Sequence, residues 1–234
     1  MSLGARSWEG WLADYRAVVA RMLRDERLGS ACDLGCGDGS FARSMLPPGT
    51  ALSGVENHEA KAGAAAAAGM DVLVHDLNTP LPYADASFDV VFSHFVVEHI
   101  LDADTHLAEA RRILRPGGVA IVGTENLASW HNVLALMLGQ QPFTMTIALS
   151  PTKRLGNVFQ PGRFGALGED ESPHLRVFAH QGLKDMLASH GFAVERMAGA
   201  GYFPLPGGAG RAMARLDARH AALILAKARA PRAA

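Results

Sequence analysis

The sequence predicts an α/β fold built on a doubly wound, mostly parallel sheet of seven strands. Short apolar runs alternate with amphipathic segments along residues 8–126, which is typical of parallel strands joined by crossover helices. A glycine-rich turn follows the first apolar run, at the place where such sheets bind ligands. Two more apolar runs, separated by proline and glycine, close the chain and indicate an antiparallel hairpin at one edge of the sheet.

The expected elements follow from the spacing of the apolar residues. We expect helices over residues 8–27, 39–46, 58–70, 102–114 and 178–191. We expect strands over residues 30–34, 50–56, 71–77 and 88–92, then a turn and a fifth strand within residues 115–126, and a final pair at 192–201 and 220–229. Asp102 or Asp104 is the expected N-cap of one helix, and Gly191 ends another.

The composition is that of a globular protein. Hydrophobic residues make up 49% of the 234 residues, and the net charge of -1 comes without a long run of Lys or Arg, so we do not expect nucleic-acid binding. Two cysteines, Cys32 and Cys36, are too few for a disulfide framework or a zinc site. Neither a signal peptide nor a run of about 20 apolar residues is present, so we expect a cytoplasmic protein without a membrane span.

One stretch breaks the alternation of strands and helices. We expect residues 1–234 to form a single domain, with an N-terminal helix within residues 1–28 and an insertion at residues 125–178. So long an irregular region in a compact domain is usually functional. Its apolar and aromatic residues are Trp130, Leu134, Leu136, Met137, Leu138, Phe143, Met145, Phe159 and Phe164. They favour a lid over an apolar or aromatic small molecule, or else a cover for the sheet or a homodimer contact.

The turn after the first strand reads DLGCGDG, with glycine at every second position. Glycine lets a ligand approach the backbone, and the start of the following helix favours an anionic group. Glu56 follows Gly35 by 21 residues and ends the second strand, where an acid can bind both hydroxyls of a ribose. Asp76 ends the third strand, where the adenine of a bound nucleoside would lie. NAD and S-adenosylmethionine both fit this pattern.

Two details favour S-adenosylmethionine over NAD. A dinucleotide-binding turn has the form G-x-G-x-x-G, and Ser40 stands here at the position of the third glycine. Asp33, just before the turn, suits the ammonium of an amino acid better than a pyrophosphate, because a carboxylate attracts a cation and repels an anion.

At this point the sequence resembles the class I S-adenosylmethionine-dependent methyltransferases, and within them the small-molecule branch of the ubiquinone- and biotin-pathway type. The resemblance rests on DLGCGDG, Glu56, HDLNTPLPYADASFDVVFSHFVVEHILD and RRILRPGGVAIV, which cover residues 28–124 in the expected order. It implies a Rossmann-like methyltransferase fold, S-adenosylmethionine as the cofactor, and an enzyme that methylates a small molecule.

The resemblance also implies which residues bind the cofactor. The methionine part would lie against the glycine turn, the ribose on Glu56 and the adenine amino group on Asp76. His94, just past the fourth strand, would face the methionine end, and Tyr15 would cover the cofactor from the first helix. The full set is Tyr15, Asp33, Leu34, Gly35, Cys36, Gly37, Gly39, Glu56, Asn57, His58, Asp76, Leu77, Ser93 and His94.

The chemistry of methyl transfer points to histidine. The nucleophile must be held in line with the activated methyl group, so positioning supplies much of the rate. A hydroxyl acceptor also gains from a general base, for which His is the usual residue. We select His94 and His131 as the catalytic candidates among the ten His residues. We interpret His99 as a structural residue and His174 as a solvated loop residue.

Other positions bear on the acceptor. Glu125 and Asn126 follow the fifth strand, at the edge of the sheet where the site is expected, so we expect them to contact the acceptor. The stretch after the fourth strand reads SHFV rather than the Asn/Asp-Pro-Pro-aromatic pattern of enzymes that methylate the exocyclic amines of bases. No cluster of metal-ligating acids of the catechol type is present, so we expect no metal.

Three functions follow from these observations. The first is an S-adenosylmethionine-dependent methyltransferase that acts on a hydroxyl of an apolar or aromatic metabolite. The second is an NAD-dependent oxidoreductase, which the same glycine turn and Glu56 would serve. The third is a non-catalytic subunit that binds the cofactor for a partner. The complete series of motifs favours the first.

Overall fold

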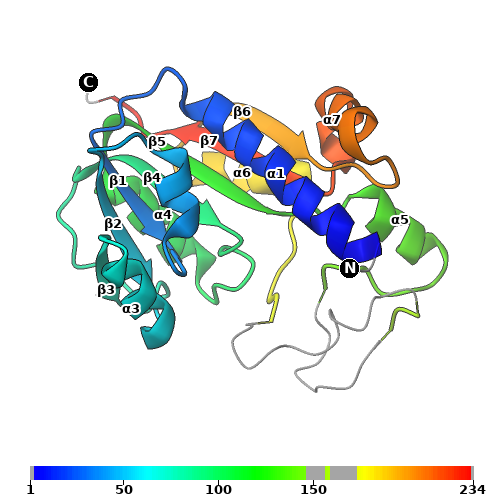
Figure 1. The fold of residues 1–234 in the computed structure, drawn as a ribbon, viewed down its shortest axis with the longest axis horizontal. Coiled ribbons are helices and arrows are strands. Elements are labelled where there is room, and N and C mark those ends of the chain that lie inside the picture. The colour runs from blue at the N-terminus through cyan, green and yellow to red at the C-terminus, as the bar shows by residue number, and fades with distance from the viewer. Residues whose placement is uncertain (1–2, 146–155, 159–172, 233–234) are drawn as a thin grey trace.

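The computed structural model describes residues 3–145, 156–158 and 173–232, which form a sheet of seven strands with helices on both faces (Figure 1). The strands are β1 (Ser30–Leu34), β2 (Ala51–Glu56), β3 (Asp71–Val74), β4 (Phe88–His94), β5 (Leu114–Glu125), β6 (Ala193–Ala200) and β7 (Leu223–Arg229). Their order is β3-β2-β1-β4-β5-β7-β6. Neighbours pair in parallel, except that β7 is antiparallel to both β5 and β6. The predicted doubly wound sheet with an antiparallel edge is therefore confirmed.

Helices cover both faces of this sheet. They are α1 (Leu3–Leu23), α2 (Ser40–Met45), α3 (Glu59–Ala67), α4 (Ala103–Ile113), α5 (Trp130–Met137), α6 (His180–Ser189) and α7 (Gly207–Leu216), with a 3-10 turn at Ala218–His220. α1 crosses one face over β6 and β7, whereas α4 and α6 pack into the core on the other face (Figure 1). Among the described residues, no helix is both long and apolar enough to cross a membrane.

The alternation of apolar side chains along each strand separates two cores. On β7, Leu223 and Leu225 face the core shared with α1, whereas Ile224 faces the core shared with α4 and α6. All three side chains are almost completely buried. A strand that is buried on both faces is typical of the middle of an α/β sheet. The polar groups of such a sheet therefore gather where its strands end.

The structure differs from the expected elements at several places. β3 ends at Val74, because the Asp76 carboxylate accepts hydrogen bonds from the backbone and side-chain amides of Asn78 and turns the chain. β4 continues to His94, beyond the expected end at residue 92. The stretch between β6 and β7 contains α7, which the sequence did not indicate because glycines in its first turn disfavour a helix.

The ends of several helices also bear on the expectations. Asp102 is the N-cap of α4, since its Oδ1 accepts a 3.0 Å hydrogen bond from the Thr105 amide. Gly191 follows α6 with a φ of 78°, in the left-handed region that glycine adopts freely. α1 ends at Leu23 instead of residue 27. Within the expected insertion, Phe159 and Phe164 lie outside the described residues.

Tyr15 fixes α1 to the sheet. The side chain is completely buried, and a Cβ on Gly123 of β5 would overlap its hydroxyl, so glycine at that position makes room for the phenol. The hydroxyl shares a 2.6 Å hydrogen bond with Nδ1 of His94, the last residue of β4. α1 is therefore coupled to the edge of the sheet where a ligand is expected.

We expect Gly123→Ala to lower the free energy of unfolding by about 1–3 kcal/mol, because the added methyl group displaces the Tyr15 ring. Urea unfolding followed by circular dichroism measures the change. Gly10→Ala on the exposed side of α1 is the matched control, since nothing lies within 4 Å of its new Cβ. Alanine there should raise stability by roughly 0.5–1 kcal/mol. Equal effects of the two substitutions would contradict the packing argument.

Candidate active site

Polar side chains from four strand ends gather at one edge of the sheet. β1, β2, β4 and β5 run parallel, so their carboxyl ends lie on the same side. These ends carry Asp33, Glu56, His94 and Glu125. The glycine turn leaves β1 at this same edge, and we describe the edge as the candidate active site.

The glycine turn is attached to β2, because the Gly35 amide donates a 2.8 Å hydrogen bond to the Val55 carbonyl. Gly35, Gly37 and Gly39 have φ angles of 76°, 55° and 72°, a region that favours glycine. A Cβ on Gly35 would overlap Val96, whereas a Cβ on Gly37 would meet nothing within 4 Å. Gly35 is therefore required for packing, and Gly37 is the position that leaves the backbone open to a ligand.

The carboxylate of Glu56 reaches toward this turn. Its Oε2 accepts a 2.8 Å hydrogen bond from the Gly37 amide, and its Oε1 accepts a 2.9 Å bond from the His58 amide. A carboxylate has about four lone-pair sites, so two remain for further donors such as the hydroxyls of a ribose. The structure thus brings together Glu56, Gly37 and His58, three residues of the predicted cofactor site.

Asp33 lies one strand away and is 2% exposed. Its Oδ1 has no hydrogen-bond partner among the described residues. Burial, and then the charge of Glu56, raise the pKa of Asp33 to about 7. A cation close to such a carboxyl favours its ionised form. The ammonium of an amino acid is a cation of this kind, so the orphaned oxygen fits a cofactor that carries a methionine part.

The other predicted cofactor residues surround this pair. Asp76 is exposed, and the two bonds from Asn78 lower the pKa of its carboxyl. Leu77 packs into the apolar core, and Asn57 is exposed after β2. Three further residues of the predicted set are buried in or beside the turn: Leu34, Cys36 and Gly39.

His94 is held from two sides. Its Nδ1 bonds to the Tyr15 hydroxyl, and its ring centroid lies 3.8 Å from that of Phe41. Its Nε2 is buried and has no hydrogen-bond partner in the described structure. Burial lowers the pKa of His94 to about 3, and it also raises the pKa of Tyr15. Both rings are therefore neutral at physiological pH.

Two predicted cofactor residues direct their hydroxyls to other side chains of the protein. Ser93 Oγ lies 3.0 Å from Nε2 of His106, a buried residue of α4. Tyr15 has no exposed surface and reaches the site through His94. Direct contacts of Ser93 and Tyr15 with the cofactor stay predictions.

His131, the other catalytic candidate, lies on α5 within an aromatic cluster. Its ring stacks on Trp11 of α1 with 5.6 Å between the centroids. Phe143 and Phe203 meet it edge-on at 5.5 and 6.0 Å. Burial lowers the pKa of His131 to about 4, and its Nδ1 has no hydrogen-bond partner in the described structure. α1 therefore contacts both catalytic candidates, through Tyr15 and through Trp11.

The two residues expected to contact the acceptor differ in their surroundings. Asn126 is completely buried, and its side chain donates to the carbonyls of Arg219 and Ala221, so it supports the fold. The Glu125 side chain is 13% exposed, and its Oε2 lies 3.5 Å from Nδ1 of His174. Burial raises the pKa of Glu125 to about 7. Glu125 therefore remains at the site.

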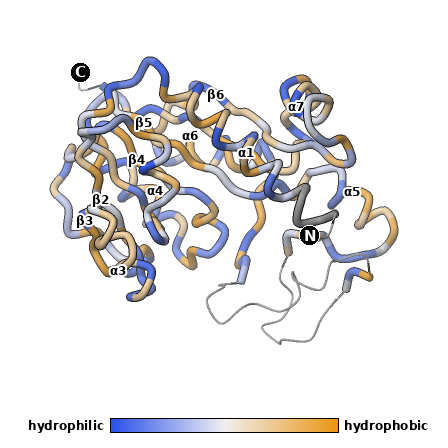
Figure 2. The backbone as a smooth tube through the Cα atoms, viewed as in Figure 1, coloured by the Kyte–Doolittle hydropathy of each residue, from blue (hydrophilic) through white to orange (hydrophobic). Residues whose placement is uncertain are grey.

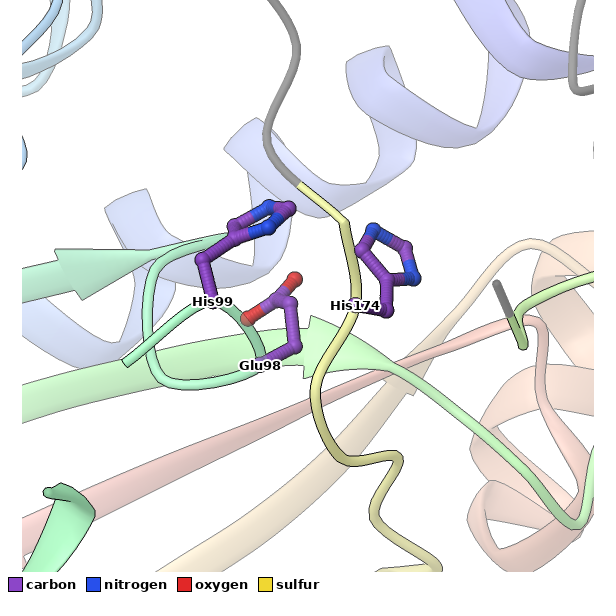
Figure 3. Close-up of side chains that lie close together, drawn as sticks. All are labelled: Glu98, His99 and His174. Carbon is purple, nitrogen blue, oxygen red and sulfur yellow. The ribbon is translucent and has the colours of Figure 1, made fainter. Parts of the chain in front are cut away.

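The structure adds Glu98, which the sequence did not single out. Glu98 lies with His99 and His174 in one cluster (Figure 3). Burial is the main cause that raises the pKa of Glu98 to about 7. In the sequence, the only indication of a role for Glu98 was that it stands beside His99 in VVEHI. His174 follows far along the chain, so only the fold brings the three side chains together.

Comparison with known proteins agrees with this fold. Residues 32–122 match the family described as "Methyltransferase domain". A protein of Mycolicibacterium smegmatis named "Probable S-adenosylmethionine-dependent methyltransferase" is 29% identical over 216 residues, which are 92% of this chain and 69% of that protein. The ubiquinone biosynthesis O-methyltransferase of Mesorhizobium japonicum is 32% identical over 120 residues, 47% of this chain and 48% of that protein. The match thus spans about half the length of the second relative.

Solved structures show the same fold. An S-adenosylmethionine-dependent methyltransferase from Mesorhizobium loti has a TM-score of 0.61 and 22% identity, with 91% of this chain and 96% of that chain covered. The [4+2]-cyclase SpnF has a TM-score of 0.62 and 18% identity, with 94% and 80% covered. Because the second structure is named for a different reaction, the fold by itself does not specify the chemistry.

The sheet order, the glycine turn after β1 and the acid at the end of β2 define a protein that binds a nucleoside-containing cofactor. The matched residues 32–122 contain both the turn and Glu56. The matched domain and the relatives show an S-adenosylmethionine-dependent methyltransferase, for which S-adenosylmethionine is the cofactor.

We expect the affinity for S-adenosylhomocysteine to rise with pH up to about pH 7. In the free protein, Asp33 keeps its proton to about pH 7. An ammonium group favours the ionised carboxylate, so binding at lower pH releases a proton. Calorimetric titration in buffers of different ionisation enthalpy measures that proton. Asp33→Asn should abolish the release and Asp185→Asn, on α6, should keep it; a release that persists in Asp33→Asn would overturn the assignment.

Glu56→Ala should weaken the binding of S-adenosylhomocysteine by about 10–100-fold, because it removes charge-assisted hydrogen bonds worth about 1.5–3 kcal/mol. Calorimetric titration measures the affinity, and circular dichroism shows whether the variant is folded. Glu59→Ala removes an exposed acid from the first turn of α3 and is the matched control. Unchanged affinity in folded Glu56→Ala would refute the role in ribose binding.

Proposed function

We propose that this protein transfers the methyl group of S-adenosylmethionine to a hydroxyl of an apolar or aromatic small molecule. The aromatic cluster around His131 carries the proposal, because it combines flat apolar surfaces with a nitrogen that can accept a proton. The ubiquinone biosynthesis O-methyltransferases among the relatives support an oxygen acceptor.

The surface beside this cluster supports an apolar acceptor. α5 carries His131 near its start, and Figure 2 shows this helix as a hydrophobic stretch at the rim of the molecule. Leu134, Leu136 and Met137 are 46%, 54% and 77% exposed. Exposed apolar side chains that lie together usually mark a place where a ligand or another chain binds.

When it is bound, S-adenosylmethionine supplies an activated methyl group. The chain must hold the acceptor oxygen in line with that group, at about 3–3.5 Å. The aromatic rings of Trp11, Phe143 and Phe203 can hold a flat acceptor by stacking. His131 is neutral at physiological pH, so we assign it as the base that takes the hydroxyl proton.

His94 has a different part in this proposal. Its Nδ1 is engaged with the Tyr15 hydroxyl, and its ring lies against Phe41, so its orientation is already set by neighbouring side chains. We therefore assign His94 to the wall beside the methionine end of the cofactor, with Tyr15 as the residue that orients its ring.

The proposed partners follow from the same surface. The net charge of -1 and the absence of a long run of Lys or Arg favour a small-molecule acceptor over a nucleic acid. The exposed side chains of α5 would serve either a lid over that acceptor or a homodimer contact. A cytoplasmic location, expected from the sequence, stays a prediction.

Incubation with radiolabelled S-adenosylmethionine and a panel of phenols, catechols and aliphatic alcohols tests the proposal. We expect the label on the oxygen of an aromatic compound. His131→Asn should lower kcat/KM by about 10²–10⁴-fold, the usual contribution of a general base, and it should leave the affinity for S-adenosylhomocysteine unchanged. His190→Asn, which removes an imidazole paired with Asp104 on α4, is the control.

One result would overturn this function, and a second would overturn the assignment of the base. One is a methyl group delivered only to nitrogen or carbon across a broad panel of acceptors. The other is full activity of His131→Asn, which would leave methyl transfer in place and remove His131 as the base. A folded protein that binds the cofactor and methylates nothing would support a binding subunit instead.

A further inference from the structure

A second cluster of titratable side chains lies beside the candidate active site, and the proposed methyl transfer does not use it. It consists of Glu98 and His99, from the loop after β4, and His174, from the segment that precedes α6 (Figure 3). One carboxylate oxygen and one nitrogen of each imidazole all lie within 4.8 Å of one another. The loop follows the end of β4, and Nδ1 of His174 lies 3.5 Å from Oε2 of Glu125 at the end of β5.

Backbone hydrogen bonds hold these two segments together. The Glu98 carbonyl accepts a 2.8 Å bond from the Leu175 amide and a 3.3 Å bond from the Arg176 amide. The Arg176 guanidinium donates to the carbonyls of Ile100 and Leu101 at 2.5 and 2.9 Å. The segment before α6 is therefore fixed against the loop after β4, and the cluster does not depend on mobile side chains alone.

Glu98 is the unusual member of the cluster. It is 2% exposed, and neither of its carboxylate oxygens has a hydrogen-bond partner in the described structure. Among the described residues no Lys or Arg forms an ion pair with it. A buried carboxylate in this state needs a proton or a cation.

Both imidazoles are oriented as metal-binding imidazoles commonly are. Nδ1 of His99 lies 3.0 Å from the Pro173 carbonyl oxygen, and Nδ1 of His174 lies 2.7 Å from that of Thr144. A carbonyl only accepts, so each Nδ1 donates its proton, and a metal ion would be bound through Nε2. A carbonyl on one nitrogen fixes the ring and makes the other nitrogen a better ligand.

We propose that Glu98, His99 and His174 together bind one divalent first-row transition ion, of the class of Mn²⁺, Co²⁺ and Zn²⁺. Two imidazoles and one carboxylate suit these ions, whereas Mg²⁺ and Ca²⁺ prefer oxygen ligands alone. Ligand atoms on one such ion stand roughly 3–4 Å apart, so the cluster, now within 4.8 Å, contracts slightly on binding. Three protein ligands leave positions for water or for an oxygen of the acceptor.

Direct metal titration tests the site without any methyl transfer. The full chain, without a histidine tag, is freed of metal by dialysis against EDTA and titrated separately in a calorimeter with the chlorides of Mn²⁺, Co²⁺ and Zn²⁺, and with MgCl₂ for comparison. We expect saturable binding of one ion per chain. Co²⁺ should in addition produce visible absorption bands, because imidazole and carboxylate ligands replace its water.

Variants connect that binding to the cluster. Glu98→Gln, His99→Asn and His174→Asn should each weaken binding by about tenfold or more. Glu98→Gln keeps the shape of the side chain and removes a buried charge, so we expect it to fold and to melt no lower than the parent chain. His190→Asn is the matched control, since its imidazole also faces a carboxylate, 3.0 Å from Asp104 on α4, and it should bind the ion as the parent does.

Several results would overturn the proposal. They are the absence of saturable binding for all three ions, equal affinity of Glu98→Gln and the parent chain, and tighter binding of Mg²⁺ than of Co²⁺. The first result together with an infrared band of a protonated carboxylic acid that Glu98→Gln lacks would show that a proton occupies the site. Metal binding that persists while no acceptor is methylated would count against the proposed function alone.

Discussion

The burial of carboxyl groups at the carboxyl ends of the parallel strands is the constraint on which this protein depends. Asp33, Glu56 and Glu98 are 2%, 8% and 2% exposed, and in the described part of the chain none of them pairs with Lys or Arg. Glu56 is stabilised by two backbone amides, whereas Asp33 and Glu98 keep oxygens without partners. Removing a carboxylate from water without a partner is costly, so this edge of the sheet favours cationic ligands.

The unsatisfied carboxyls lie at different places along that edge. Asp33 lies near the end of β1, beside the glycine turn against which the methionine part of the cofactor is predicted to lie. Glu98 follows β4, where the segment before α6 brings two imidazoles to it. An ammonium group suits the site of Asp33, where no imidazole of the described residues is grouped with the carboxylate. A metal ion suits the site of Glu98, because the two imidazoles beside it supply nitrogen ligands. Two buried carboxyl groups that each require a cation therefore suit two different kinds of cation.

Helix α1 completes the core and also positions two histidines. Tyr15 is accommodated because β5 has glycine at position 123, and its hydroxyl then holds the ring of His94 at the end of β4. Trp11, one turn earlier on the same helix, stacks on His131 of α5. Since both contacts come from one helix, the ring of His94 and the aromatic cluster around His131 are held in a fixed relation to each other.

The amino-acid sequence by itself determined the α/β class, the antiparallel edge, the glycine turn and Glu56, because spacing along the chain is enough to place these features. Tertiary structure decided the rest. α7 forms despite its glycines, Ser93 turns toward His106, and Gly35 is required by Val96 rather than by a ligand. The grouping of Glu98 and His99 with His174, and the burial that lowers the pKa of His94, depend on contacts between residues far apart in the chain. Such contacts leave no periodic trace in a sequence, because they arise only when separate elements pack.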